Sequence, residues 1–310
     1  MNDSLTQSGL IDDLAAGYQL QDQPLIGRIV RLGPAIDEVL TRHDYPEAVA
    51  GLLGEICVLA SLVGSSLKFQ GRLIVQAQGQ GGPVRFVTAD YDASGDLRGY
   101  AGFDQEAVQA LEAETPRPNA DQLLGGGVLI LTLDQGADFE RQQGVVSLEG
   151  ESLSDAAERY FAQSEQIPTR VRLGVGRVFD GQGERWRAGG LSLQTLAGDA
   201  ARGETAHAFE HGEALFNTLG VDELVDPTVP ADRLLYRLFH EDGVRMNTPT
   251  VIRARCRCSH ERVMGMLKSF PQDEVEAMRR DDGMVEVRCE YCSRDYRIAP
   301  DAVQSSRSSE

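Results

Sequence analysis

The sequence has no surplus of positive charge. Its 30 Lys and Arg residues stand against 48 Asp and Glu residues, which gives a net charge of −18 and an isoelectric point of about 4.7. Proteins that bind nucleic-acid phosphates or anionic membrane surfaces need a basic face. The charge therefore argues against both kinds of partner. The hydrophobic fraction of 41% and charged fraction of 25% are typical of a soluble globular protein.

Long uninterrupted hydrophobic runs are also missing. The most apolar stretch, residues 48–67, is interrupted by Glu55 and by three glycines, which favours a buried helix over a membrane span. Residues 1–23 contain no basic region followed by an apolar run, so we expect no signal peptide. These absences predict a cytoplasmic protein, in a reducing compartment where close cysteine pairs indicate metal or redox chemistry.

The common enzyme motifs do not occur. The glycine cluster at 79–83 matches neither a P-loop nor a dinucleotide fingerprint, so we expect a hairpin turn there. Ser65 and Ser66 lie in neither of the usual serine-nucleophile motifs. His207 and His211 match the HxxEH pattern of inverted zinc proteases, but they fall in an acidic segment and are expected on a solvated helix face. We predict that the chain is not an enzyme.

Cysteine is scarce, yet four of the five cysteines form two close pairs near the C-terminus. Cys256 and Cys258 are followed, after thirty residues, by Cys289 and Cys292. Two such pairs can supply the four thiolates of a tetrahedral zinc site, and thirty residues suffice for a helix and a hairpin between them. We therefore predict one bound Zn²⁺ per chain. Cys57 lies in the apolar stretch and is expected in the core.

The same four thiols allow redox chemistry, because nearby arginines are expected to favour the thiolate form. Once a metal is lost, near neighbours can form disulfides, Cys256 with Cys258 and Cys289 with Cys292, although two crossed pairings are also possible. Such short loops stabilise a fold little. Loss of the roughly 10–16 kcal/mol of apparent zinc binding, in contrast, would unfold a small module. The arginines are Arg253, Arg255, Arg257, Arg288 and Arg294.

The order of the predicted elements indicates an α+β fold with mixed helices and strands in an N-terminal core domain, residues 1–197. An acidic helical linker, 198–250, a small zinc-binding domain, 251–302, and a disordered polar tail, 303–310, are expected to follow. Strands are expected at 27–33, 72–78, 84–91, 97–103, 127–133, 145–148, 170–179 and 186–193. Helices are expected at 34–42, 46–64, 104–114, 152–163, 204–219 and 231–241.

The expected linker combines acidity with an apolar stripe. Residues 199–242 contain ten acidic and three basic residues. Within them Leu234, Leu235, Leu238 and Phe239 fall on one side of the predicted helix. This pattern predicts a helix that docks on an apolar surface and can leave it.

Several stretches between residues 27 and 300 are similar to one known family. They are His43–Glu47, Gly64–Phe69, Tyr160–Thr169, Leu234–Gly243 and the four clustered cysteines. In this order they resemble the bacterial redox-regulated holdase chaperones of the 33 kDa heat-shock protein, or 33 kDa chaperonin, family.

The resemblance implies that Cys256, Cys258, Cys289 and Cys292 hold zinc in a reduced, inactive protein. Peroxide with heat, or hypochlorous acid, would oxidise Cys289 and Cys292 first and then Cys256 and Cys258, expelling zinc and unfolding the zinc domain and linker. The activated protein would bind unfolded or partly unfolded client proteins without ATP, and would form a homodimer. The HxxEH pair is no part of that family's pattern.

Two other functions remain open. The cysteines can belong to a constitutive structural zinc-ribbon module that binds a fixed partner or RNA. Alternatively, Cys289 and Cys292 can act as a CxxC thiol oxidoreductase, although the thioredoxin-like context is missing. For Ser164, Glu165 and Gln166 we expect a buried polar structural role.

Overall fold

The computed structural model describes residues 12–67, 70–136, 139–148, 150, 152–179, 181, 183–196 and 205–307. By its internal contacts the chain divides into two compact units, Met1–Ala254 and Arg255–Glu310. Positions 68 and 69 of one family-like stretch, and residues 198–204 of the expected linker, lie outside the described residues.

The first unit contains two sheets, in which nearly all neighbouring strands are antiparallel. One sheet has the strand order β10-β1-β2-β9-β8, and β11 also pairs with β1. Its strands are β1 (Leu14–Leu20), β2 (Leu25–Leu32), β8 (Thr169–Phe179), β9 (Glu184–Thr195), β10 (Val244–Met246) and β11 (Thr250–Val251). The other sheet has the order β12-β5-β4-β3-β6-β7. Its strands are β3 (Arg72–Gly79), β4 (Val84–Asp92), β5 (Asp96–Phe103), β6 (Gly127–Asp134), β7 (Gln142–Ser147) and β12 (Arg253–Ala254).

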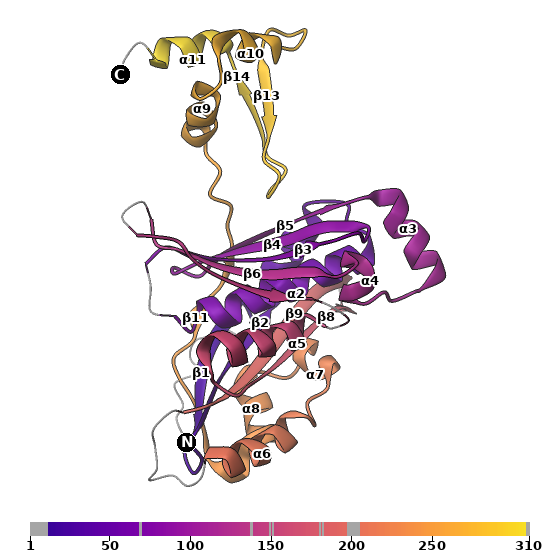
Figure 1. Ribbon diagram of the computed structural model, residues 1–310, viewed down its shortest axis with the longest axis vertical. Coiled ribbons are helices and arrows are strands. Elements are labelled where there is room, and N and C mark those ends of the chain that lie inside the picture. The colour runs from indigo at the N-terminus through magenta and orange to yellow at the C-terminus, as the bar shows by residue number, and fades with distance from the viewer. Residues whose placement is uncertain are drawn as a thin grey trace. The chain divides into compact units, whose positions relative to one another are not determined.

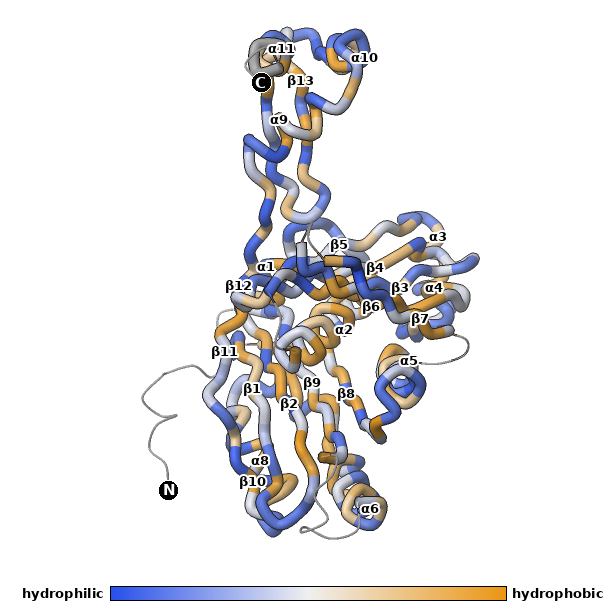
Figure 2. The backbone as a smooth tube through the Cα atoms, turned by 60° about the vertical axis from the view of Figure 1, so that its left-hand side comes forward, coloured by the Kyte–Doolittle hydropathy of each residue, from blue (hydrophilic) through white to orange (hydrophobic). Residues whose placement is uncertain are grey.

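Helix α2 (Glu47–Gly64) lies between the two sheets and forms the centre of the core (Figure 1). It is apolar nearly all round, as the sequence predicted, and packs on β3 and β4 on one side and on β8 and β9 on the other. Hydrophobic residues gather along α2 and β9 in Figure 2. Among the described residues, α2 alone is long and apolar enough to cross a membrane, but 78% of it is buried inside the protein.

The remaining helices of this unit lie at its edges. Ser152 and Asp155 form the capping box predicted at the start of α5, with Ser152 Oγ and Asp155 Oδ2 2.7 Å apart. A single π-helical turn continues α5. The helices are α1 (Pro34–Thr41), α3 (Gln105–Glu114), α4 (Ala120–Leu124), α5 (Leu153–Tyr160) and the π-turn η1 (Phe161–Glu165).

The segment expected as a linker folds within the first unit. It contains α6 (Thr205–Phe216), α7 (Val221–Val225) and α8 (Ala231–Phe239), followed by the 3₁₀ turn η3 (His240–Asp242). The predicted apolar side of α8 is buried against the β1–β2 region, where Phe239 stacks on Tyr18 with ring centroids 5.7 Å apart. The amphipathic helix is therefore confirmed, and its docking surface is the first sheet.

Three short strands and β1 did not appear among the predicted elements. β1 was missed because Ala15, Ala16 and Gly17 have low strand propensity. β10, β11 and β12 have only two or three residues each, and they form because distant strands offer them partners. The contact boundary therefore falls after Ala254 rather than after residue 250.

The second unit is small. Its elements are α9 (His260–Lys268), α10 (Gln272–Ala277), β13 (Val285–Arg288), β14 (Asp295–Ile298) and α11 (Pro300–Arg307). Its apolar cluster consists of seven buried side chains, namely Val263, Leu267, Val275, Val285, Tyr296, Ile298 and Val303. Because Val303 packs in this cluster, helix α11 extends five residues into the range expected for a disordered tail. The mixed helix-and-sheet fold class is confirmed.

Candidate metal centre

The first cysteine pair lies in the irregular segment that precedes α9. Cys256 and Cys258 follow β12, and Ser259 then caps the helix by accepting a hydrogen bond from the Arg262 amide. The cap fixes the place where the helix begins. It therefore places the CxC segment directly before the first turn of α9.

The second pair lies on the turn of the β13–β14 hairpin. The Cys289 amide donates to the Arg294 carbonyl at 2.9 Å, and the Ser293 amide donates to the Cys289 carbonyl at 2.8 Å. Ser293 adopts a left-handed conformation with φ of 55°. This tight turn brings Cys289 and Cys292 to the same end of a hairpin, and a helix and a hairpin are the elements that the sequence predicted for joining the two pairs.

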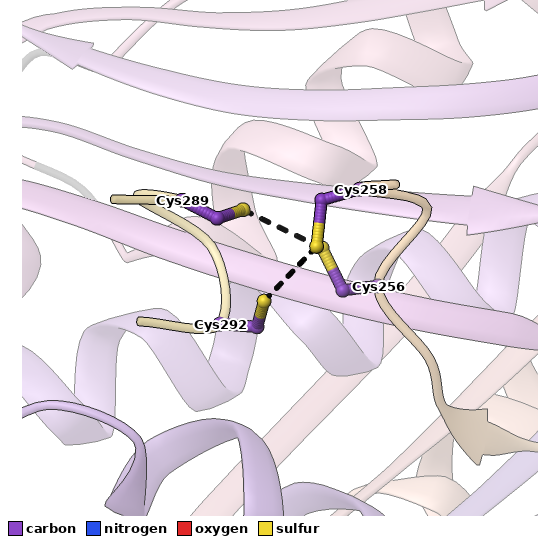
Figure 3. Close-up of side chains that lie close together, drawn as sticks. All are labelled: Cys256, Cys258, Cys289 and Cys292. Carbon is purple, nitrogen blue, oxygen red and sulfur yellow. Dashed lines mark hydrogen bonds between the residues drawn. The ribbon is translucent and has the colours of Figure 1, made fainter. Parts of the chain in front are cut away.

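The four sulfurs converge on one point (Figure 3). All of them lie within 4.8 Å of one another. Cys256 Sγ is 3.7 Å from Cys289 Sγ, and Cys258 Sγ is 3.3 Å from Cys292 Sγ. In a tetrahedral site with metal–sulfur bonds of about 2.3 Å, neighbouring sulfurs lie about 3.8 Å apart. The four cysteines can therefore hold a metal ion.

Burial opposes ionisation at this site before a metal binds. Desolvation raises the pKa of the Cys289 thiol, and it raises the pKa of the Cys292 thiol to about 12. Burial outweighs the arginine effect expected from the sequence. The pKa of the Arg294 guanidinium is nevertheless raised, by a hydrogen bond with Tyr296 and by charge interaction with the Cys258 and Cys292 thiolates. Arg288 lies nearer to Asp295, with Nε and Oδ1 3.8 Å apart. A metal must displace the thiol protons when it binds.

The HxxEH pair is not brought together as a metal site. His207 is exposed, whereas His211 Nε2 lies 3.1 Å from Asp242 Oδ2 and ties α6 to the end of α8. Within the described part of the chain, the four cysteines are the only group that could hold a metal ion. His207 lies on the solvated helix face that the sequence predicted, whereas His211 is partly covered.

The structure also tests the burial predicted for Cys57 and for residues 164–166. Cys57 is fully buried in α2, and burial raises the pKa of its thiol above the ordinary range, as expected for a core residue. Ser164, Glu165 and Gln166 are exposed, so the buried structural role expected for them is wrong. They lie where the π-turn ends and Gln166 takes a left-handed conformation.

The fold and the centre together define a class: a mixed helix-and-sheet unit followed by a small unit with a four-thiol metal centre. The family model described as Hsp33 protein matches residues 13–299. The chain belongs to the Hsp33 family, as its sequence resemblance indicated. Family membership makes it a chaperone.

Similar proteins span nearly the whole chain. The 33 kDa chaperonin of Caulobacter vibrioides is 58% identical over 300 residues, covering 97% of this chain and 99% of its own length. The 33 kDa chaperonin of an Enterobacter species is 35% identical over 281 residues, covering 90% and 89%. The crystal structure of the 33 kDa chaperonin from Thermotoga maritima has a TM-score of 0.76 at 23% identity, covers 96% and 100% of the two chains, and supports the fold.

Proposed function

We propose that this chain is a redox-regulated holdase that works without ATP. In the reduced state Cys256, Cys258, Cys289 and Cys292 bind one Zn²⁺ and the protein is inactive. The observation that carries the proposal is the convergence of the four sulfurs within 4.8 Å in a unit whose described residues include only seven buried apolar side chains. A unit with so small an apolar cluster depends on its metal for stability.

Oxidation removes the ligands of the metal. Two thiolates and one peroxide molecule, together with two protons, give one disulfide and two molecules of water. The sulfurs lose two electrons and the peroxide gains them. Disulfide sulfur is a poor ligand, so Zn²⁺ leaves after Cys289–Cys292 and Cys256–Cys258 have formed. Two close sulfur contacts in the reduced site, Cys256 with Cys289 and Cys258 with Cys292, run across the two pairs, so the pairing within each motif is itself part of the proposal.

Loss of zinc then unfolds residues 251–302 and loosens the linker, 198–250. The linker helices cover apolar side chains of β1, β2 and β9, and large exposed apolar patches bind other proteins. The activated protein binds unfolded or partly unfolded clients and forms a homodimer. We place it in the cytoplasm, without a nucleic-acid or membrane partner and without enzymatic turnover.

Reduced zinc-loaded protein and peroxide-oxidised protein test this proposal when each is added to a heat-denatured client. We expect aggregation, followed by light scattering, to be suppressed by the oxidised form alone. Equal suppression by both forms would contradict redox control. A variant with all four clustered cysteines replaced by serine separates holding activity from disulfide formation.

The constitutive zinc-ribbon module is the second candidate, because a CxxC pair on a hairpin turn suits a permanent structural metal site. It predicts that zinc stays bound during treatment with peroxide and mild heat. The thiol-oxidoreductase alternative fits less well, since Cys289 lies on a β-turn and not at the start of a helix.

A further inference from the structure

Helix α7 lies against β8 and β9 where both strands carry a glycine (Figure 1). Gly174 and Gly189 are paired across the two strands. A Cβ atom at position 189 would lie 2.4 Å from the Leu224 carbonyl oxygen, and one at position 174 would lie 2.8 Å from Val221 Cγ1. The three atoms nearest to either Cβ all belong to α7. The two glycines, here called the glycine seat, therefore make room for α7.

Two arginines of the sheet hold the C-terminal end of the same helix. Arg31 on β2 donates through Nη1 to the Glu223 carbonyl at 3.0 Å and through Nη2 to the Asp226 carbonyl. Arg187 on β9 donates through Nε to the Val225 carbonyl at 2.8 Å. The last carbonyls of a helix have no partner within the helix and carry partial negative charge. The two guanidiniums satisfy three of these acceptors.

Both guanidiniums are removed from water while α7 is in place. Arg31 is 0% exposed, and its Nε atom has no hydrogen-bond partner among the described residues. Arg187 is 9% exposed and also pairs with Asp12. A buried charge that loses its partners is strongly unfavourable. Departure of α7 therefore requires water to enter around the arginines at the same time, which makes release cooperative.

A third arginine repeats the arrangement at the end of the preceding helix. Arg172 on β8 donates through Nη1 to the Leu219 carbonyl at 2.7 Å and lies over the Phe216 ring, 5.7 Å from its centroid. β2, β9 and β8 are consecutive strands of the sheet. These three arginines form a row that binds the connection between α6 and α7 and the C-terminal end of α7, and we call the row the arginine clamp: Arg31, Arg187 and Arg172.

We propose that the glycine seat and the arginine clamp form a docking site for the C-terminal end of α7, and that this site sets how readily residues 217–229 leave the first unit. The site recognises a short helical turn by steric fit at the seat and by its free carbonyls at the clamp. Its regulatory meaning rests on the proposed function, in which release of this segment opens the switch. The docking itself does not depend on that function.

The glycine seat offers a matched pair of substitutions. Gly189→Ala places a methyl group against the α7 backbone, whereas Gly176→Ala on β8 meets only Val225 Cγ2, at the ordinary contact distance of 3.9 Å. In reduced, zinc-loaded, full-length protein we expect amide hydrogen exchange of residues 217–229 to become at least about tenfold faster in Gly189→Ala. Gly176→Ala should exchange like the wild type. Unchanged protection in Gly189→Ala, or equal loosening by Gly176→Ala, overturns the proposal.

The arginine clamp provides a second test that does not depend on tolerance of an added methyl group. Arg172→Gln removes the donor to Leu219, while Arg98→Gln breaks an arginine contact with Asp90 in the other sheet. We expect faster exchange of residues 217–229 in Arg172→Gln alone. If both variants loosen the segment equally, the effect is general destabilisation and the clamp is not a docking device.

Holding activity separates the two proposals. If the segment is loosened in Gly189→Ala, holding activity should appear at a lower peroxide concentration than in the wild type. If wild-type protein gains no activity after oxidation, the proposed function fails, but the exchange measurements still decide whether the docking site exists. If exchange is faster and the peroxide threshold is unchanged, the docking site does not set release and the regulatory part of the proposal is overturned.

Discussion

The sulfur of Cys258 lies 3.3 Å from the sulfur of Cys292, although the two cysteines are 34 positions apart in the sequence. This contact joins the segment before α9 to the β13–β14 hairpin. The apolar cluster of the second unit is formed by the same elements together with α10 and α11. A metal bound at this point therefore closes the unit, and its loss removes the strongest link between the two halves.

Removal of one sulfur should abolish metal binding and unfold the second unit. In Cys292→Ser we expect bound zinc to fall from about one per chain to none, because a structural site needs all four protein ligands. Amides of β13 and β14 should lose their protection against hydrogen exchange, whereas those of α2 keep it. Zinc content and exchange mass spectrometry measure both effects.

Cys57→Ala is the matched control, since Cys57 is buried in the core and far from the centre in sequence. We expect this variant to bind zinc as the wild type does. It should lose about 1–2 kcal/mol of stability through the small cavity that it leaves. Retention of one zinc per chain by Cys292→Ser, or its loss in Cys57→Ala, would show that the metal is bound elsewhere.

Truncation of the apolar side of α8 should loosen the linker without touching the metal. Leu235 is fully buried against the first sheet, and Leu235→Ala is expected to cost about 2–4 kcal/mol. The reduced, zinc-loaded variant should bind a hydrophobic dye and suppress client aggregation in part. Tyr236→Ala changes the next residue, which is 62% exposed, and should have little effect on either measurement. Equal behaviour of the two variants would argue against α8 as a cover.

Glu55 makes stability depend on pH. Burial raises the pKa of this α2 carboxyl from 4.5 to about 7. The folded state thus binds the proton more tightly than the unfolded state, so the contribution of Glu55 to stability is largest below pH 4.5 and is lost as the pH rises through 7. Glu55→Gln should be more stable than the wild type at pH 8, by at most about 3 kcal/mol.

The comparison of Glu55→Gln with the wild type at lower pH tests the direction of this pKa shift. The advantage of Glu55→Gln should shrink steadily between pH 7 and pH 4.5, as measured by urea unfolding. A pH-independent effect of Glu55→Gln would mean that folding does not raise the pKa of Glu55.

Local chemistry explains which elements the sequence could predict. The apolar stretch of α2, the capping box at Ser152 and the glycine turn before Val84 depend on near neighbours, and all three are found. β12 depends on pairing with β5, more than 150 residues earlier in the chain, which no local pattern reveals. Asp13 is another such case, since its side chain accepts from the amides of Gly33 and Ala35 at the start of α1.

In the metal centre, too, the sequence predicted what depends on local spacing and missed what depends on distant residues. Spacing alone predicted that the four cysteines converge, because each pair is local and one metal geometry can join them. It did not predict the effect of burial on the Cys289 and Cys292 thiols, which depends on folded surroundings. Nor could it reveal the arginine clamp, because Arg31 and Asp226 are 195 residues apart.

The most direct test of the central claim follows zinc and holding activity together. Reduced protein is treated with peroxide at elevated temperature while a colorimetric chelator reports released zinc, and samples are tested for suppression of client light scattering. The account predicts that about one zinc per chain leaves and that holding activity rises along the same time course. Zinc that stays bound, or that leaves without any gain of holding activity, would contradict it.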